Sequence, residues 1–293
     1  MDIRNITEKA PEVENGAFLE KMFDLQKELM EGYIRIEGLP RYPLNINSKK
    51  NQVVLKDFAS RAVEELAEGY ESTHYAVQMM EKVGWNLSLL SKKEHAMLIN
   101  HIQNSNEEQA DATAFYLELL IYAGIQANDL RKYALSQVAN PEDYEETPTL
   151  ELLMIVGSKL LNSFNSIILD ELSNLPKSYH LINAEDFEDA EAYEKVLGYC
   201  PGFHIMSSSL HHLEMAWLWQ IQYHLGVGRN YLKNKPWKQS GELSDEEPYF
   251  ESLYQGIIKL FGYHLHMGLT PESLYHLFFR KNRVNVFRQN SNY

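Results

Sequence analysis

The chain has 293 residues, 44% of them hydrophobic, which allows one large domain or two ordinary ones with a substantial core. Its net charge of −14 argues against non-specific binding to duplex nucleic acid, which needs a cationic surface. The single cysteine excludes an internal disulfide framework, and neither a signal-peptide pattern nor a membrane-spanning apolar run is visible. We therefore expect a soluble, cytoplasmic protein without a membrane partner.

Glycine and proline are few and separate long stretches with helical periodicity, so the sequence predicts an all-α helical bundle. Ser91-Lys-Lys-Glu94 matches a capping box, and Thr270-Pro271 matches an N-cap followed by proline at the first helical position. An acidic stretch, Glu185–Glu194, is expected to be a short solvated helix. The predicted helices are, in chain order, Phe18–Ile36, Leu55–Gln78, one that Ser91 opens, Ser105–Tyr122, Asn128–Val138, Leu150–Leu172, Ser209–Leu225, Glu247–His266 and Pro271–Asn290.

The segment Asn140–Pro148, with two prolines and four acidic residues, is the clearest linker. It divides the chain into a helical half at 1–139, the linker at 140–148 and a second helical half at 149–293. A weak repeat relates the halves, because Asp111–Ile125 can be aligned with Gln255–Leu269 as two helices that each run into a glycine turn. Since any two helix–glycine–helix units align in this way, both a true repeat and a chance match stay open.

Two pairs of carboxylates stand at a spacing of three, Glu65 with Glu68 and Glu108 with Asp111. Residues three apart share one face of a helix, and Phe115 is expected on the opposite face of the second helix. If the two helices pack together, four carboxylates meet, and a hard divalent cation such as Mg²⁺ or Mn²⁺ resolves their repulsion. The alternative is that both pairs are ordinary solvated positions in a chain with 41 acidic residues.

The last predicted helix carries cations and amides on one stripe of an otherwise acidic chain. Lys281, Asn285, Arg288 and Gln289 fall near one face of that helix. Guanidinium and ammonium groups flanked by amides suit phosphate oxygens. The pattern therefore predicts a phosphate clamp opposite the carboxylate pairs.

Taken together, these motifs resemble the all-α nucleoside triphosphate pyrophosphatases, and most of all the dimeric dUTPases of phages and trypanosomatids. The matching segments are Phe23-Asp-Leu-Gln26, Glu65-x-x-Glu68, Glu108-x-x-Asp111 and Lys281 to Tyr293. The resemblance touches most of the chain, and its terminal motif is the most specific part.

The resemblance implies Mg²⁺-dependent hydrolysis of a deoxynucleoside triphosphate, dUTP first, to the monophosphate and pyrophosphate. It implies a homodimer, or a monomer if the two halves mimic that dimer, in the host cytoplasm if the chain is phage-encoded. Glu65 and Glu68 would be catalytic, since one of them orients the attacking water. The implied site residues are Glu65, Glu68, Glu108 and Asp111 for metal, Lys238, Lys281, Asn285, Arg288, Gln289 and Tyr293 for phosphate, and Gln26 and Met30 at the base.

Two departures from the family pattern leave alternatives open. The family places an amide four residues after the glutamine, whereas this chain has Met30, which cannot read a base edge through a hydrogen bond. A family Trp-Lys segment is matched only by Lys235-Pro-Trp-Lys238, in the second half. The alternatives are a pyrophosphatase for dCTP, dTTP, a purine dNTP or a modified nucleotide, and a non-catalytic helical interaction protein on the same fold.

Overall fold

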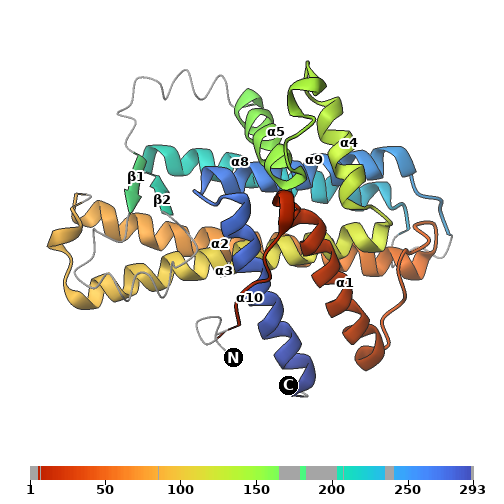
Figure 1. The fold of residues 1–293 in the computed structure, drawn as a ribbon, viewed down its shortest axis with the longest axis horizontal. Coiled ribbons are helices and arrows are strands. Elements are labelled where there is room, and N and C mark those ends of the chain that lie inside the picture. Colours follow the sequence, from red (N-terminus) through yellow and green to blue (C-terminus); the bar gives the residue numbers. More distant parts are fainter. Residues whose placement is uncertain are drawn as a thin grey trace.

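The computed structural model describes residues 6, 8–84, 86–164, 179–182, 203–206, 208–234 and 241–291, and this part of the chain is predominantly helical (Figure 1). The all-α prediction is therefore confirmed. The α-helices are α1 (Phe18–Glu37), α2 (Lys49–Lys82), α3 (Lys92–Ala123), α4 (Ala127–Ser136), α5 (Thr149–Phe164), α8 (Ser208–Tyr231), α9 (Glu246–His266) and α10 (Pro271–Asn290). Short 3₁₀ turns lie at Glu14–Gly16, Leu87–Leu89 and Pro141–Tyr144, and the strands β1 (Tyr179–Ile182) and β2 (Phe203–Met206) pair antiparallel.

Helix ends follow the local signals in the sequence. Ser91 accepts a hydrogen bond from the amide of Glu94 while the Glu94 carboxylate accepts one from the amide of Ser91, which completes the predicted capping box. Thr270 caps α10 in the same reciprocal manner with Ser273, and proline occupies the first turn. At the other end of α3, Gly124 adopts a left-handed conformation that stops the helix.

One boundary prediction was wrong. The sequence suggested separate helices beginning at Ser91 and at Ser105, but α3 runs unbroken between Lys92 and Ala123. Serine favours the N-cap position of a helix, so Ser105 is compatible with a helix start on local grounds. In the structure the Ser105 hydroxyl is buried and lies 2.9 Å from the hydroxyl of Thr73 on α2, so it joins two helices instead of starting one.

Other bounds differ less. Helix α8 continues to Tyr231, past Gly226 and Gly228 and beyond the predicted end at Leu225. Helix α5 is described to Phe164, and the rest of its predicted span lies outside the described residues, as does the acidic Glu185–Glu194 stretch. None of the helices in the described part combines the length and apolar character needed to cross a membrane.

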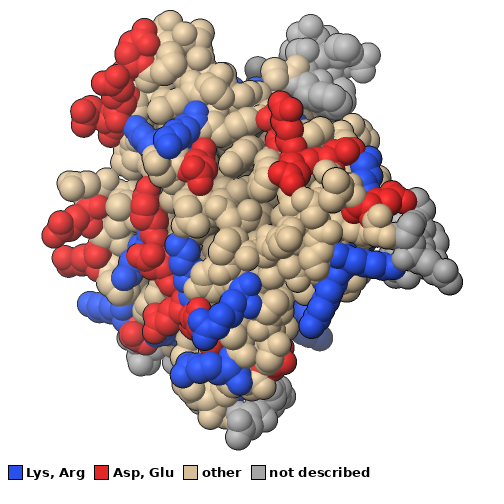
Figure 2. Space-filling model, turned by 90° about the vertical axis from the view of Figure 1, so that its right-hand side faces the viewer, with Lys and Arg blue, Asp and Glu red and all other residues tan. Residues whose placement is uncertain are grey.

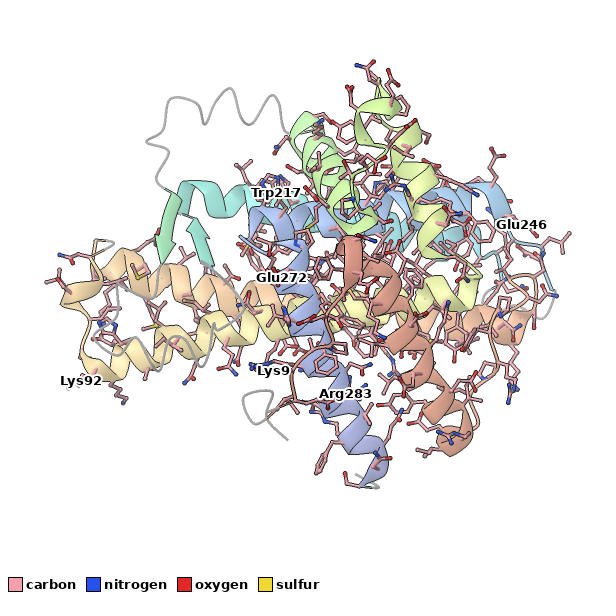
Figure 3. All side chains as sticks on the ribbon, in the orientation of Figure 1. Lys9, Lys92, Trp217, Glu246, Glu272 and Arg283 are labelled. Carbon is pink, nitrogen blue, oxygen red and sulfur yellow. The ribbon has the colours of Figure 1, made fainter. Side chains whose placement is uncertain are left out.

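The helices pack as crossed pairs. Helices α2 and α3 form a long hairpin, α8 and α9 run beside each other and contact it, and α5 packs on α9 (Figure 1). Helices α1 and α10 lie side by side and both contact α3. The hairpin extends beyond the other described helices, with Lys92 at its tip (Figure 3). On the face shown in Figure 2, acidic and basic side chains are interspersed, without the continuous basic band that duplex nucleic acid requires.

One core joins the two halves of the sequence. The buried Tyr116 hydroxyl on α3 donates to the carbonyl of Leu253 on α9 (3.1 Å). His264 of α9 is fully buried between α3 residues, with Nδ1 3.1 Å from Gln109 Oε1 and Nε2 2.8 Å from Thr113 Oγ1. Burial lowers the pKa of His264 to about 3, so the imidazole is neutral and satisfied by these partners.

Helices α5 and α9 touch backbone to backbone at a pair of glycines. A methyl group on Gly157 would overlap the carbonyl oxygen of Ile258, and one on Gly262 would overlap the Gly157 backbone. Neither obstacle is a flexible side chain, so the helices would have to separate. The crossing therefore requires glycine at both positions.

We predict that Gly157→Ala lowers the free energy of unfolding by about 1–3 kcal/mol or more, because overpacked cores cannot relax without backbone shifts. Gly226→Ala on α8 is the matched control, since nothing lies within 4 Å of its added methyl; it should be neutral or stabilising by up to about 1 kcal/mol. Urea unfolding followed by circular dichroism measures both, and equal stabilities for the two variants would contradict the assigned contact.

Candidate functional site

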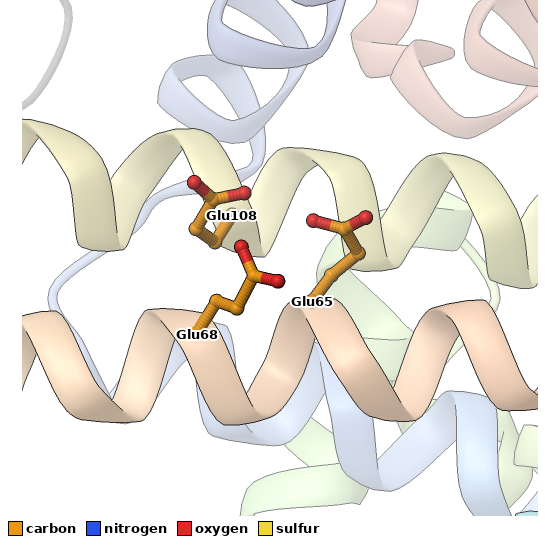
Figure 4. A group of neighbouring side chains, drawn as sticks. All are labelled: Glu65, Glu68 and Glu108. Carbon is orange, nitrogen blue, oxygen red and sulfur yellow. The ribbon is translucent and has the colours of Figure 1, made fainter.

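Three carboxylates converge where α2 and α3 run side by side. The two helices are in contact here, since a methyl group on Gly69 of α2 would lie 3.4 Å from Cβ of Glu108 on α3. Glu65, one turn before Gly69, and Glu68, directly before it, project toward α3 and meet Glu108 (Figure 4). One ligand oxygen of each lies within 4.8 Å of the others. The spacing of three therefore does place Glu65 and Glu68 on one face.

Burial, together with the neighbouring acids, favours the protonated forms of Glu65 and Glu108. Burial, a hydrogen bond to Glu108 and the charges of Asp111, Glu108 and Glu68 raise the pKa of Glu65 to about 8. Burial also raises the pKa of Glu108, although the hydrogen bond to Glu65 and the charge of Lys281 oppose the shift. Carboxyls that resist ionisation in the absence of a counter-charge are suited to a cation of high charge density.

Asp111, the fourth predicted ligand, is mostly buried and paired with a cation. Its Oδ2 lies 2.8 Å from Nζ of Lys281 on α10, and Glu107 Oε2 lies 3.6 Å from the same nitrogen. Burial raises the pKa of Asp111, and Lys281 opposes that shift. Burial disfavours the charged form of Lys281, but Asp111, Glu107 and Glu108 outweigh it and raise the pKa of the ammonium. Lys281 thus binds the acidic cluster directly.

A cavity of about 440 Å³ opens beside this cluster between α1, α2, α3 and α10. Glu65 and Asp111 form part of its wall, and Asn285 and Arg288 of α10 face it from the other side. Arg288 Nη1 lies 3.4 Å from Asn285 Oδ1. The remaining wall residues that matter here are Gln26, Met30, Tyr33, Phe58, Arg61, Phe115, Glu118 and Tyr122. The structure therefore brings predicted metal, phosphate and base residues to one space, namely Glu65, Asp111, Asn285, Arg288, Gln26 and Met30, whereas Glu68, Glu108 and Lys281 lie beside the cavity and not in its wall.

The sequence reasoning missed Glu118, a buried carboxyl in the cavity wall. Gln26 Nε2 on α1 donates a hydrogen bond to Glu118 Oε1 at 2.8 Å, and burial raises the pKa of Glu118 to about 8 despite that bond. Glu118 follows Asp111 by seven residues, hence on the same face of α3, within the apolar run Phe115–Ile121. A single acidic residue within an apolar run was the sequence signal that could have identified Glu118 as a candidate site residue.

Arg61 was also missed. It precedes Glu65 by four residues on α2, so it shares the carboxylate face. Its guanidinium lies 5.5 Å from the ring centroid of Phe58 and 5.6 Å from that of Phe115, and its Nε is 2.9 Å from Asp57 Oδ2. This adds a second arginine to the cavity, held over two aromatic rings.

Some predicted site residues lie elsewhere. Gln289 donates from Nε2 to the carbonyl of Leu29 on α1 (2.9 Å) and fills the space above Gly32, so it joins α10 to α1 and does not line the cavity. Phe115, expected on the opposite face, lines the cavity together with Asp111, because the two are one helical turn apart. The predicted phosphate ligands Lys238 and Tyr293 lie outside the described residues.

The helix pair α8–α9 has the same kind of crossing without the acids. A methyl group on Gly228 would meet the Ser252 side chain, as one on Gly69 would meet Glu108, and Ser252 is the residue that the sequence alignment pairs with Glu108. Four residues before Gly228 stands His224, with Nε2 2.8 Å from Nζ of Lys259. Burial, and then Lys259, lowers the pKa of His224 to about 4. This crossing therefore carries an imidazole, paired with Lys259, where the first carries the Glu65 carboxylate.

Comparison with models of known families, with curated proteins and with solved structures found no match to this chain.

We predict that Mg²⁺ or Mn²⁺ raises the melting temperature more at pH 8 than at pH 6. Between its ordinary pKa of 4.5 and about 8, Glu65 keeps its proton when folded and loses it when unfolded, so its contribution to stability falls as pH rises. A bound cation replaces that proton and restores stability, and protons compete with it less at high pH.

Scanning calorimetry across this pH range, with and without the cation, measures the effect. Glu65→Gln should abolish the cation-dependent increment, whereas Glu64→Gln, an exposed neighbour on the same helix, should keep it. A cation response that is independent of pH and of Glu65 would rule this cluster out as the binding site.

Proposed function

We propose that the chain is a Mg²⁺-dependent nucleoside triphosphate pyrophosphatase, with dUTP the first substrate to test. The observation that carries the proposal is the single cavity that joins Glu65 and Asp111 to Asn285, Arg288 and Gln26 across four helices. Paired carboxylates, phosphate-binding groups and an amide for a base are the three parts that this reaction needs.

The carboxylate cluster fits a hard divalent cation. All of its groups are oxygen donors, three of them converge within 4.8 Å, and burial raises the pKa of Glu65 and of Glu108. When bound, Mg²⁺ would lower the pKa of water and neutralise charge on the phosphates. Glu65, Glu68 and Glu108 would hold it, with Asp111 joining from the same face of α3.

The chain's own residues supply orientation and proton transfer. Glu65 or Glu68 would orient the attacking water and accept its proton as the water oxygen bonds to phosphorus. The phosphorus–oxygen bond to pyrophosphate breaks in the same displacement. Arg288 and Asn285 would hold the leaving phosphates, since a guanidinium and an amide donate to several phosphate oxygens at once.

The cavity has a direction that suits a nucleotide. Asp111 and Glu118 stand on one face of α3, seven residues apart, which is about 10 Å along the helix axis. Phosphates near Asp111 and Arg288 would place a base near Glu118, Gln26 and the aromatic wall. This arrangement supports an enzyme more than a non-catalytic interaction protein. Because Met30 in the same wall cannot hydrogen-bond to a base edge, dCTP, dTTP, purine dNTPs and modified dNTPs remain alternative substrates.

We further infer one acidic site per chain. The α8–α9 crossing repeats the glycine contact of α2–α3, which favours the internal repeat suggested by the sequence. The alignment pairs Glu108 and Asp111 with Ser252 and Gln255, and His224 precedes Gly228 by four residues as Glu65 precedes Gly69, so the second crossing has no carboxylates at these three positions. The phosphate grip nevertheless comes from the second half, through α10.

We predict that Glu108→Gln lowers the rate of pyrophosphate release from the best dNTP by more than roughly 100-fold. Loss of a residue that only supports a metal ligand typically costs roughly 10- to 100-fold, and Glu108 would contact the cation itself. A coupled phosphate assay on a panel of dNTPs measures it. Glu64→Gln, the exposed neighbour in the same helix, should remain close to wild type. Unchanged turnover in Glu108→Gln would refute the metal assignment.

We predict that Arg288→Gln raises KM for the dNTP about 10- to 100-fold, since a hydrogen bond to a charged group contributes about 1.5–3 kcal/mol. Arg280→Gln on the same helix is the control, because Arg280 does not line the cavity. Steady-state kinetics on both variants separates them. If the two arginines behave alike, α10 does not provide the phosphate grip through this face.

A further inference from the structure

The amide of Gln26 has one polar atom that nothing in the described chain satisfies. Its Nε2 donates to Glu118 Oε1 at 2.8 Å, but its Oε1 is buried and has no hydrogen-bond partner among the described residues. Gln26 itself is only 1% exposed, yet it belongs to the cavity wall. A buried carbonyl oxygen of this kind is a place where a ligand donor is expected, because leaving it unpaired costs free energy.

We propose that Glu118 is a positioning residue, which holds the Gln26 amide so that its carbonyl oxygen reads an N–H group on the nucleotide base. The inference rests on the proposed function, and it assigns base recognition to an acid–amide pair that joins α3 and α1. By accepting from one N–H of Nε2, Glu118 fixes the orientation of the Gln26 amide and leaves its Oε1 without a partner among the described residues, so that this oxygen can accept a hydrogen bond from the base.

The surroundings of the pair argue against a purely structural role. Glu118 has no salt-bridge partner among the described residues, and it interrupts an otherwise apolar stretch of α3. Burying a carboxyl and an amide together stabilises a core less than apolar side chains of the same size would. The pKa of Glu118, raised to about 8, shows how strongly its environment resists the charge.

The walls beside the pair suit a flat heteroaromatic ring. Phe58 and Tyr122 face the same cavity with ring centroids 5.2 Å apart, and Met30 provides an apolar surface one turn along α1 from Gln26. None of these side chains presents an amide or carboxyl group to a base edge. Among the buried polar atoms of this wall that lack a partner, the Gln26 carbonyl oxygen and the Tyr122 hydroxyl can bond to a base, and only the carbonyl oxygen is restricted to accepting.

Binding of non-hydrolysable nucleotides tests the proposal. The probes are α,β-imido-dUTP and its N3-methyl derivative, and α,β-imido-dCTP and its N4,N4-dimethyl derivative, each with Mg²⁺; methylation removes the N–H donors from the base edge. Isothermal titration calorimetry on the full chain gives the ratio of Kd values for each methylated and parent pair. For the wild type we expect one parent to bind at least about tenfold more tightly than its methylated form.

Two variants separate positioning from folding. Glu118→Gln retains an oxygen that can accept from Gln26 Nε2 and should keep the wild-type ratio, whereas Glu118→Met cannot accept and should reduce the ratio to within about threefold. Glu214→Gln is the matched control, since Glu214 is also a fully buried carboxyl, accepting from Tyr263 in the α8–α9 pair. Circular dichroism verifies that each variant is folded.

The outcomes are distinguishable. A wild-type ratio that persists in Glu118→Gln and Glu214→Gln but collapses in Glu118→Met supports the proposal. Nucleotide binding with an unchanged ratio in Glu118→Met, or with no discrimination in the wild type, overturns it and leaves the proposed function standing. If the wild type binds no triphosphate in the presence of Mg²⁺, the proposed function fails and the base-reading role fails with it.

Discussion

The close approach of α2 and α3 forces several carboxylates into one partly buried space, where their negative charges repel one another. The arrangement of the cavity depends on how that electrostatic repulsion is relieved. The 2.8 Å contact of Lys281 with Asp111 ties α10 to α3. Helix α10 is joined in turn to α1, because Gln289 and Asn282 donate to the carbonyls of Leu29 and Leu25. The acids therefore help to locate the two helices that complete the cavity around them.

This arrangement costs stability at the same place where it creates chemistry. Glu65 and Glu118 both have pKa values raised to about 8, so the folded chain resists their ionisation. A core designed for stability alone would hold leucine at such positions. Ionisable groups retained in a cavity with strongly shifted pKa values are typical of functional sites, where a ligand supplies the missing partner. The raised pKa values of Glu65 and Glu118 and the unpaired carbonyl oxygen of Gln26 therefore both indicate a ligand-binding site.

Local rules predicted much of the fold and only part of the site. Helix caps such as Ser91 and Thr270 depend on neighbouring residues, and the carboxylate spacing depends on helical geometry, so both were readable from the sequence. The role of Gln289 was not readable from the sequence. Arg288 and Gln289 are adjacent on α10, and the rotation of that helix in the fold directs Arg288 to the cavity and Gln289 to α1. The role of Glu118 could not be predicted locally either, because its hydrogen-bond partner Gln26 is 92 residues away in the sequence.

The contrast between the two glycine crossings separates packing from chemistry. At Gly69 and at Gly228 a side chain of the neighbouring helix lies within contact of an added methyl group, and this packing is independent of the charges nearby. At the first crossing Glu65 is short of positive charge, whereas at the second Lys259 donates to a neutral His224 and the two groups satisfy each other. A ligand gains little binding free energy from a pair of groups that already satisfy each other, whereas a cation gains more from a carboxylate cluster that lacks a counter-charge. The same helical frame can thus serve as a scaffold at one crossing and as a binding site at the other.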